Sequence, residues 1–178
     1  MPSLEPLGLG DACLLRCEVV QDDRGVFHRT YDAAALRNAG FTLTAEQSSV
    51  AYNRHRHTLR GLHFQKRPAE EAKLVSCVRG SVFDVIVDVR EDSPTRLQWR
   101  GRRLTALSGE SLYVPEGFAH GYLTLTAHAT LLYQMSVPHD PTAAAGLRWD
   151  DPALAIEWPH LPEVVSARDR AFPLIERS

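Results

Sequence analysis

The stretch Ser81-Val-Phe-Asp-Val-Ile-Val-Asp-Val89 has the side-chain pattern of a β-strand. Odd-numbered positions from Phe83 to Val89 are all apolar, whereas Asp84 and Asp88 occupy the alternate positions. Successive side chains of a strand point to opposite faces, so this period of two predicts a strand with one wholly apolar face.

Short segments of the same kind recur on both sides of this stretch. Clusters of Gly, Pro, Asp or Ser separate several of them, as in Glu91-Asp-Ser-Pro94, and such clusters are typical of turns. Many short strands at close spacing predict an all-β sandwich or barrel, because closure hides the edges of a sheet. The six further strands that we expect are Cys13 to Val20, Leu59 to Phe64, Lys73 to Val78, Leu112 to Val114, Gly121 to Leu125 and Ala129 to Met135.

Two segments depart from the strand pattern. Asp32-Ala-Ala-Ala-Leu-Arg-Asn-Ala-Gly40 begins with a capping residue and ends with a glycine, which predicts one short N-terminal helix. The tail from Asp151 onward contains four prolines. Because proline is rare inside strands, we expect an irregular C-terminal tail with a short helix.

Length and composition limit the classes of protein. The 178 residues fit one domain, residues 1–178, with a single core. The formal charge of −2 argues against a nucleic-acid binder. The apolar runs are too short to cross a membrane, and no secretory signal is visible at the N-terminus. Three cysteines cannot all pair within one chain, so we expect reduced thiols and a cytoplasmic location.

Three stretches hold residues suited to chemistry. Arg54 to Gln65 is rich in arginine and histidine, Lys73 starts a predicted strand, and a turn around Gly117 precedes His120. A strand period of two would put Arg60 and His63 on opposite faces unless Gly61 bends the strand. Each group taken singly is more often a surface or structural residue than a functional one. The residues alone therefore predict a soluble β-barrel with an anion site.

Taken together, these stretches resemble the dTDP-4-dehydrorhamnose 3,5-epimerase family, and the resemblance runs from Asp22 to Asp169. Eight segments carry it in the right order. They are Leu59-Arg-Gly-Leu-His-Phe-Gln65, Lys73-Leu-Val75, Phe83-Asp-Val-Ile-Val-Asp-Val-Arg90, Ser93-Pro-Thr95, Tyr113-Val-Pro-Glu-Gly-Phe-Ala-His-Gly121, Trp149-Asp-Asp-Pro152, Ile156-Glu-Trp-Pro159 and Ser166-Ala-Arg-Asp169.

The resemblance implies a cupin-type double-stranded β-helix, or jelly roll, that works without metal or cofactor and assembles as a homodimer. It also implies epimerisation of a dTDP-4-keto-6-deoxyhexose at C3 and C5, in deoxysugar biosynthesis such as that of lipopolysaccharide. His63 resembles the family's catalytic base and Asp169 the carboxylate that orients it. Lys73 resembles the cation beside the ketone oxygen, and Tyr133 the acid on the opposite face.

Four further positions match residues that bind substrate in the family. Arg60 and His120 match positions that line the active site. Arg24 and Phe27 match positions that reach into the pocket of the neighbouring subunit, so the resemblance implies residues exchanged between subunits.

Some segments depart from the family pattern. The family's Gln-x-Asn-x-Ser-x-Ser run is replaced by Ser48-Ser-Val-Ala-Tyr-Asn-Arg54. Arg29 stands where the family has an acidic residue, and Pro138-His139 where it often has two aromatic residues. Since these regions help to line the sugar and nucleotide pockets, an epimerase of C3 alone, on a related nucleotide-linked 4-keto sugar, stays open.

Two other classes of protein also remain open. His55 and His57 form a His-x-His pair, as in metal-dependent cupins, but the carboxylate expected a few residues later is missing. A non-catalytic sugar-nucleotide binding module on the same fold is the second. The complete set of His63, Lys73, Tyr133 and Asp169 favours an enzyme over such a module.

Overall fold

The computed structural model describes residues 3–41 and 43–176, and these form two β-sheets, one hairpin and two short helices. The first sheet has the order β1-β2-β10-β7-β12-β5. Its strands are β1 (Ser3–Pro6), β2 (Cys13–Arg16), β10 (Glu110–Val114), β7 (Lys73–Arg79), β12 (Thr130–Met135) and β5 (Gln47–Tyr52). The strands that are neighbours in this order all run antiparallel.

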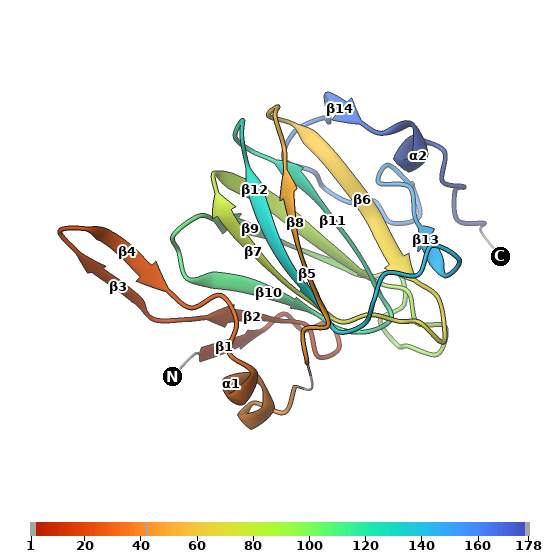
Figure 1. Cartoon of the computed structure of the whole chain (residues 1–178). Helices are drawn as coiled ribbons and strands as arrows, with labels where there is room; N and C mark the ends of the chain where they lie inside the picture. Colours follow the sequence, from red (N-terminus) through yellow and green to blue (C-terminus); the bar gives the residue numbers. More distant parts are fainter. Residues whose placement is uncertain (1–2, 42, 177–178) are drawn as a thin grey trace.

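The second sheet has the order β13-β6-β11-β8-β9, and β14 pairs in parallel with β6. Its strands are β13 (Ala144–Gly146), β6 (Thr58–Gln65), β11 (Phe118–Thr124), β8 (Ser81–Asp88), β9 (Trp99–Thr105) and β14 (Val164–Val165). The two sheets lie face to face in Figure 1 and enclose a core to which both contribute, with Val75 and Leu131 from the first and Ile86 and Leu104 from the second. This arrangement is a jelly roll, as predicted.

Strand β8 shows how the sheet places polar groups inside the barrel. Val82 and Ile86 belong to the core between the sheets, and Asp84 shares their face. Val85 and Val87 point to the outer face, where residues of the C-terminal tail such as Leu154 and Trp158 cover them. The continuous apolar face predicted from the sequence is therefore the outer one, and the face carrying the acidic side chains lines the interior.

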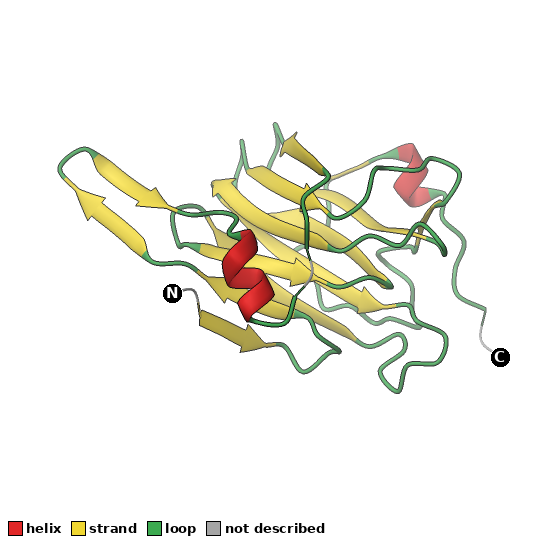
Figure 2. Cartoon of the chain, turned by 60° about the horizontal axis from the view of Figure 1, so that its bottom comes forward, coloured by secondary structure: helices red, strands yellow, loops and turns green. Residues whose placement is uncertain are grey.

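A separate hairpin projects from the barrel. Strands β3 (Val19–Asp22) and β4 (Gly25–His28) pair with each other and extend away from both sheets in Figures 1 and 2. The predicted single strand from Cys13 to Val20 is wrong, because the chain leaves the sheet after Arg16 and begins the hairpin at Val19. Phe27 is 72% exposed and Val20 53% exposed, so the hairpin presents apolar side chains to the surroundings.

The two helices are short. Helix α1 (Ala33–Asn38) begins after Asp32, whose side chain accepts a hydrogen bond from the Ala35 amide, as its capping pattern predicts. Helix α2 (Ala167–Arg170) lies in the otherwise irregular tail, beside β6 in Figure 1. Among the described residues, no helix is long and apolar enough to span a membrane.

Candidate active site

Gly61 bends β6 so that Arg60 and His63 face the same side. Its φ is 128°, and a Cβ atom there would lie 2.5 Å from the Gly121 Cα, so only glycine fits this close approach. The register between β6 and β11 shifts at this point, which pairs Arg60 with Tyr122 and His63 with His120. The bulge therefore overcomes the period of two and directs both candidate side chains into the barrel.

His63 is held by a buried carboxylate. Its Nε2 lies 2.7 Å from Asp169 Oδ1, and Asp169 Oδ2 accepts a hydrogen bond from the Gly61 amide at 3.1 Å. Burial alone would raise the pKa of the Asp169 carboxyl, but these hydrogen bonds hold that pKa below its ordinary value. The ionised carboxylate only accepts hydrogen bonds, so Nε2 carries the proton and Nδ1 is left as the basic atom. The His63 side chain is 40% exposed and that of Asp169 only 4%, so the histidine is the accessible member of the pair.

The short helix α2 delivers Asp169. Its N-cap Ser166 accepts a hydrogen bond from the Asp169 amide at 3.0 Å, which fixes the first turn. Phe172, just beyond the helix, packs edge-on against the His63 ring with centroids 6.0 Å apart. The tail thus supplies both the orienting carboxylate and an apolar wall to the histidine.

A second histidine, which is buried, lies beside the predicted acid. His120 Nε2 is 2.8 Å from Asp84 Oδ1, and the His120 ring meets the Tyr133 ring edge-on at 5.8 Å. Burial raises the pKa of Asp84, and the neighbouring His120 opposes that rise. Desolvation, with Tyr122 and Asp84 nearby, also raises the pKa of Tyr133 well above its ordinary value, so its phenol is protonated at neutral pH. Sequence reasoning did not select Asp84, although its place on the polar face of β8 was the signal available.

Lys73 is nearly buried at the start of β7. Its Nζ forms an ion pair with Glu71 Oε1 at 2.8 Å, and both side chains are about one-tenth exposed. Lys73 also acts electrostatically on Asp84, whose pKa it lowers against the effect of burial. The cation therefore belongs to the same charged interior as Asp84 and His120, with Glu71 as a partner that the sequence did not suggest.

Arg60 reaches a polar group that sequence reasoning also missed. Its Nε donates to Asn53 Oδ1 at 2.9 Å, and the Tyr122 hydroxyl donates to the same oxygen at 3.1 Å. Asn53 lies just beyond β5, in the run that departs from the family pattern, so no sequence signal marked it. The structure thus joins Arg60 to two residues on the inner side of the barrel.

Arg24 and Phe27 stand apart from the six other predicted site residues. Both lie on the projecting hairpin, where the Arg24 side chain is 90% exposed and pairs with Asp22. Within one chain, the structure does not bring them to His63 or Tyr133. Their role in a neighbouring subunit's pocket remains a prediction.

The His-x-His pair does not have the geometry of a cupin metal site. His57 has a φ of 56° in a turn, its Nδ1 lies 2.7 Å from Glu163 Oε1, and its ring stacks on His160. His55 is exposed in the same turn, so the two rings do not share the face of a strand. Within residues 3–41 and 43–176, no group of three or more His, Cys, Asp or Glu side chains could hold a metal ion.

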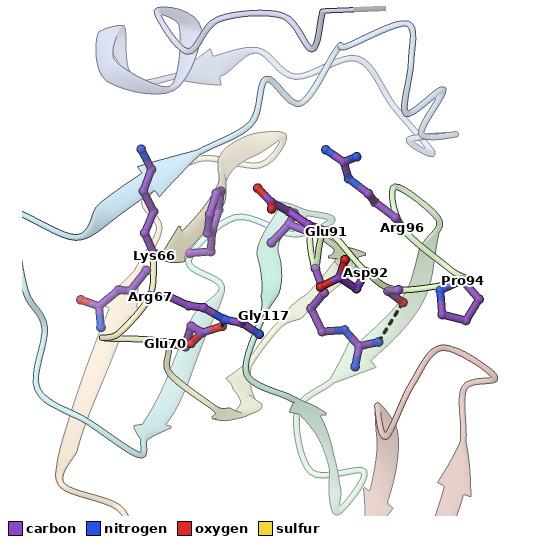
Figure 3. Close-up of a pocket in the computed structure, with 13 residues that line it drawn as sticks. Lys66, Arg67, Glu70, Glu91, Asp92, Pro94, Arg96 and Gly117 are labelled. Atoms are coloured by element: carbon purple, nitrogen blue, oxygen red, sulfur yellow. Dashed lines mark hydrogen bonds and ion pairs between the residues drawn. The ribbon is translucent and has the colours of Figure 1, made fainter. Parts of the chain in front are cut away.

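A pocket of about 760 Å³ lies elsewhere on the barrel, between Lys66 and Arg67 after β6 and the loop that carries Glu91 and Arg96 (Figure 3). The charged side chains that line it have both signs. None of the eight predicted site residues lines this pocket. The candidate active site is therefore the cluster around His63, Lys73, His120 and Tyr133 rather than this hollow.

Comparison with known proteins identifies the class and then the family. A jelly roll with such an internal polar cluster is a cupin-type barrel. The family model for dTDP-4-dehydrorhamnose 3,5-epimerase matches residues 6–177. The dTDP-4-dehydrorhamnose 3,5-epimerase of Salmonella typhimurium is 40% identical over 171 residues, which cover 94% of this chain and 92% of the relative. The chain belongs to the dTDP-4-dehydrorhamnose 3,5-epimerase family.

Two further relatives refine the comparison. A crystal structure of dTDP-4-dehydrorhamnose 3,5-epimerase from Bacillus anthracis, with TDP and PPi bound, has a TM-score of 0.92 and 39% identity, and the match covers 97% of this chain and 100% of that one. A dTDP-4-dehydrorhamnose 3-epimerase of Streptomyces niveus is 39% identical over 168 residues, covering 94% of this chain and 81% of the relative. The family thus includes enzymes named for two centres and for one.

Proposed function

We propose that this chain epimerises a dTDP-4-keto-6-deoxyhexose at C3 and C5, as an isomerase of deoxysugar biosynthesis. The observation that carries this function is the pair of His63 with the buried Asp169, which leaves an accessible basic nitrogen inside the barrel. The C3 and C5 protons of such a sugar lie beside a carbonyl group, so removing either one gives an enolate. Only protons move in this reaction, and it therefore needs no cofactor.

His63 is the base in this mechanism. A neutral imidazole has an ordinary pKa of about 6.5, which suits proton abstraction at neutral pH. Asp169 accepts a hydrogen bond from the Nε2–H group, so Nδ1 takes the proton from carbon. The carboxylate also stabilises the imidazolium that forms, as the aspartate of a catalytic triad does.

Lys73 stabilises the enolate. An ammonium group fixed in a largely buried position needs little reorganisation when negative charge develops on the ketone oxygen. Preorganised stabilisation of this type is worth about 3–4 kcal/mol. Both epimerisation steps pass through an enolate of the same carbonyl, so Lys73 serves both.

Tyr133 supplies the proton on the face opposite His63. A single base could only return the proton to the face from which it came, so inversion needs a second group. The raised pKa of Tyr133, caused first by burial, keeps its phenol loaded for donation at neutral pH. Arg60 and His120 complete the site, with the Arg60 guanidinium suited to the diphosphate of the nucleotide. The Bacillus anthracis relative, which was crystallised with TDP and PPi, supports a nucleotide substrate.

An epimerase of C3 alone is the second candidate. The relative from Streptomyces niveus bears that name and is 39% identical, almost as similar as the 3,5-epimerase of Salmonella typhimurium at 40%. The base, cation and acid would have the same roles at one carbon instead of two. Proton exchange followed separately at C3 and C5 distinguishes the two functions.

We also propose a homodimer in which the β3–β4 hairpin enters the partner's pocket. Phe27 and Val20 are more than half exposed on this hairpin, and burying such apolar surface favours association. Arg24, in the turn of the same hairpin, would bring a cation to the nucleotide. Replacing the exposed Phe27 of strand β4 with Asp should give a monomer in light scattering, whereas an unchanged dimer would contradict this arrangement.

The remaining features of the proposal concern the chain as a whole. Residues 1–178 would act as one domain, and the enzyme would work in the cytoplasm. The unpaired Cys13, Cys17 and Cys77 support a reducing compartment.

A coupled assay tests the proposed activity. The enzyme is incubated with dTDP-4-keto-6-deoxyglucose and a stereospecific reductase that accepts only the doubly inverted ketone. Formation of the rhamnose sugar, at a rate proportional to this enzyme, is the expected result. If the reductase stays idle with this enzyme but turns over when an active control epimerase is added, epimerisation at both centres is contradicted. The mechanism also requires that His63→Ala show no turnover.

A further inference from the structure

The C-terminal tail meets β6 through two matching pairs of histidine and carboxylate. His57 Nδ1 lies 2.7 Å from Glu163 Oε1, and His63 Nε2 lies 2.7 Å from Asp169 Oδ1. In each pair, 106 residues separate the partners in the chain. Between the two pairs, β14 runs parallel to the start of β6 (Figure 1). The tail and β6 therefore have the same number of residues between the first contact and the second.

His57 holds the tail by its backbone as well as by its side chain. Its carbonyl oxygen accepts hydrogen bonds from the amides of Glu163 and Val164, at 2.9 Å and 3.3 Å. Its ring stacks on that of His160, with centroids 4.5 Å apart. The His57 side chain is only 13% exposed, whereas that of Glu163 is 70% exposed. The tail thus lies over a nearly buried imidazole, and Glu163 closes the contact from the solvent side.

His57 occupies a backbone conformation that favours glycine. Its φ of 56° lies in the left-handed region, where other residues are strained unless their surroundings hold them. Its amide donates to Thr124 O on β11, which fixes this turn on the barrel. Its Nε2 is buried and has no hydrogen-bond partner among the described residues. The directional contact of the ring is therefore the one to Glu163, whose carboxylate accepts the Nδ1 proton in a hydrogen bond.

Little else fixes the register of the segment between the two pairs. Strand β14 contains only Val164 and Val165, and Val164 is 40% exposed. A strand that is short and buries little apolar surface specifies its register weakly. A slip by one residue would move the tail by about 3.3 Å along β6. That distance is larger than the hydrogen bond between Asp169 and His63 tolerates.

We propose that His57 and Glu163 are positioning residues for Asp169, an inference that rests on the proposed function. Their contact sets the register of the tail on β6, so that the Asp169 carboxylate meets His63 Nε2 and leaves Nδ1 as the base. Neither residue belongs to the site cluster, and both act through Asp169. The hydrogen bond from the Gly61 amide to Asp169 Oδ2 reports whether the tail is in place.

Four variants isolate this contact. Glu163→Ala removes it without disturbing a buried side chain. Glu163→Gln is the conservative variant, since its amide oxygen can still accept the hydrogen bond from Nδ1. Glu176→Ala is the matched control, because Glu176 is an exposed carboxylate on the same tail beyond α2. His57→Gly removes the imidazole and suits the φ of 56° at this position.

Amide hydrogen exchange measures the placement of the tail without substrate. In Glu163→Ala we expect the Gly61 amide to exchange about threefold to fivefold faster, the size of effect that an exposed ion pair supports. The amide of Leu123, buried in β11, should exchange at the wild-type rate because the barrel itself is unchanged. Glu163→Gln and Glu176→Ala should keep the wild-type rate at Gly61.

Steady-state kinetics with the coupled reductase measure the effect on the proposed reaction. Glu163→Ala should lower kcat by about threefold to fivefold. Its KM should stay near the wild-type value, because the groups proposed to bind the substrate are unchanged. In the His57→Gly background, Glu163→Ala should have no further effect on kcat, since the same contact is lost only once. Effects that multiply would show that Glu163 acts elsewhere and would overturn the inference.

The outcomes separate this inference from the proposed function. With normal wild-type epimerisation, unchanged amide exchange at Gly61 in Glu163→Ala would overturn the positioning role alone, as would faster amide exchange with unchanged kcat. Equal acceleration at Gly61 and Leu123 would also overturn it, because the contact would then stabilise the whole fold. A correctly folded wild-type protein without epimerisation would overturn the proposed function and the positioning role in that reaction together.

Discussion

His63 Nε2 and Asp169 Oδ1 lie 2.7 Å apart although 106 residues separate them in the chain. The contact depends on two local features, the bend at Gly61 that turns His63 inward and the short helix that carries Asp169 to β6. Gly61 itself donates its amide to Asp169, so the same glycine orients both members of the pair. Four predictions follow from the roles of these groups and their neighbours.

Asp169→Asn should lower kcat by roughly 10⁴-fold, as replacement of the orienting aspartate by asparagine does in triads. If the new amide keeps an oxygen toward the Gly61 amide, its nitrogen faces His63 Nε2 and moves the imidazole proton to Nδ1, the atom that must be free. Steady-state kinetics with the reductase coupled measure the effect. Asp92→Asn changes an exposed carboxylate in the loop that lines the separate pocket, and it should leave kcat unchanged. Full activity of Asp169→Asn would contradict the assigned tautomer.

Tyr133→Phe should still exchange substrate protons with solvent but invert poorly. His63 can remove a proton and return deuterium from its own face, whereas the opposite face has lost its donor. Nuclear magnetic resonance in deuterated water measures exchange, and the coupled reductase measures inversion. Equal loss of the two rates would count against a division of labour between the faces.

Lys73→Met should reduce exchange and inversion together. Both depend on the same enolate, and loss of one preorganised charge typically costs about 10²–10³-fold in rate. The Glu71→Gln variant is a useful companion, because it removes the partner of the ion pair and keeps the ammonium. Normal exchange in Lys73→Met would show that another group stabilises the oxyanion.

Asp88→Asn should lower stability at neutral pH by about 2 kcal/mol, the value of hydrogen bonds to a buried charge. Burial opposes ionisation of Asp88, but hydrogen bonds from Arg90, Ser93 and Thr95 outweigh it and hold the pKa of this carboxyl well below its ordinary value. In the unfolded chain an aspartate carboxyl titrates at about pH 3.9.

The sign of the pH dependence follows from these two pKa values. Between them the unfolded state binds more protons, so the contribution of Asp88 is complete above the unfolded pKa and is lost as the pH falls toward the folded one. Urea unfolding at pH 7 and at pH 3 should therefore show a smaller difference in Asp88→Asn than in the wild-type protein. An identical pH dependence in both proteins would contradict the assignment.

Most of the fold could be predicted because local patterns agree with it. The alternation from Ser81 to Val89, the cap at Asp32 and the prolines of the tail each correspond to an observed element. The split after Arg16 could not be predicted, because exposed Val19 and Val20 read as apolar strand residues whether they face a core or the surroundings. Edge strand β5 was missed because three polar residues are followed by Val50, Ala51 and Tyr52 without alternation, and Val50 and Tyr52 are exposed.

Candidate site residues could be selected from the sequence only where one residue type implies one chemistry. His63, Lys73 and Tyr133 are such residues, and the resemblance to the family selected them. Asn53 and Tyr122 act through hydrogen bonds between strands that are far apart in sequence, and such partners appear only when the strands are paired. Asp84 lies in a predicted strand, but its inward direction could not be predicted. The apolar face of that strand is the outer one, because the C-terminal tail covers it.

Position-resolved proton exchange tests the central claim most directly. Wild-type enzyme and His63→Ala are each mixed with dTDP-4-keto-6-deoxyglucose in deuterated water, and nuclear magnetic resonance follows the C3 and C5 protons separately. Wild-type enzyme should introduce deuterium at both carbons, and His63→Ala at neither. Exchange by His63→Ala at the wild-type rate, or no exchange by a correctly folded wild-type enzyme, would contradict the account.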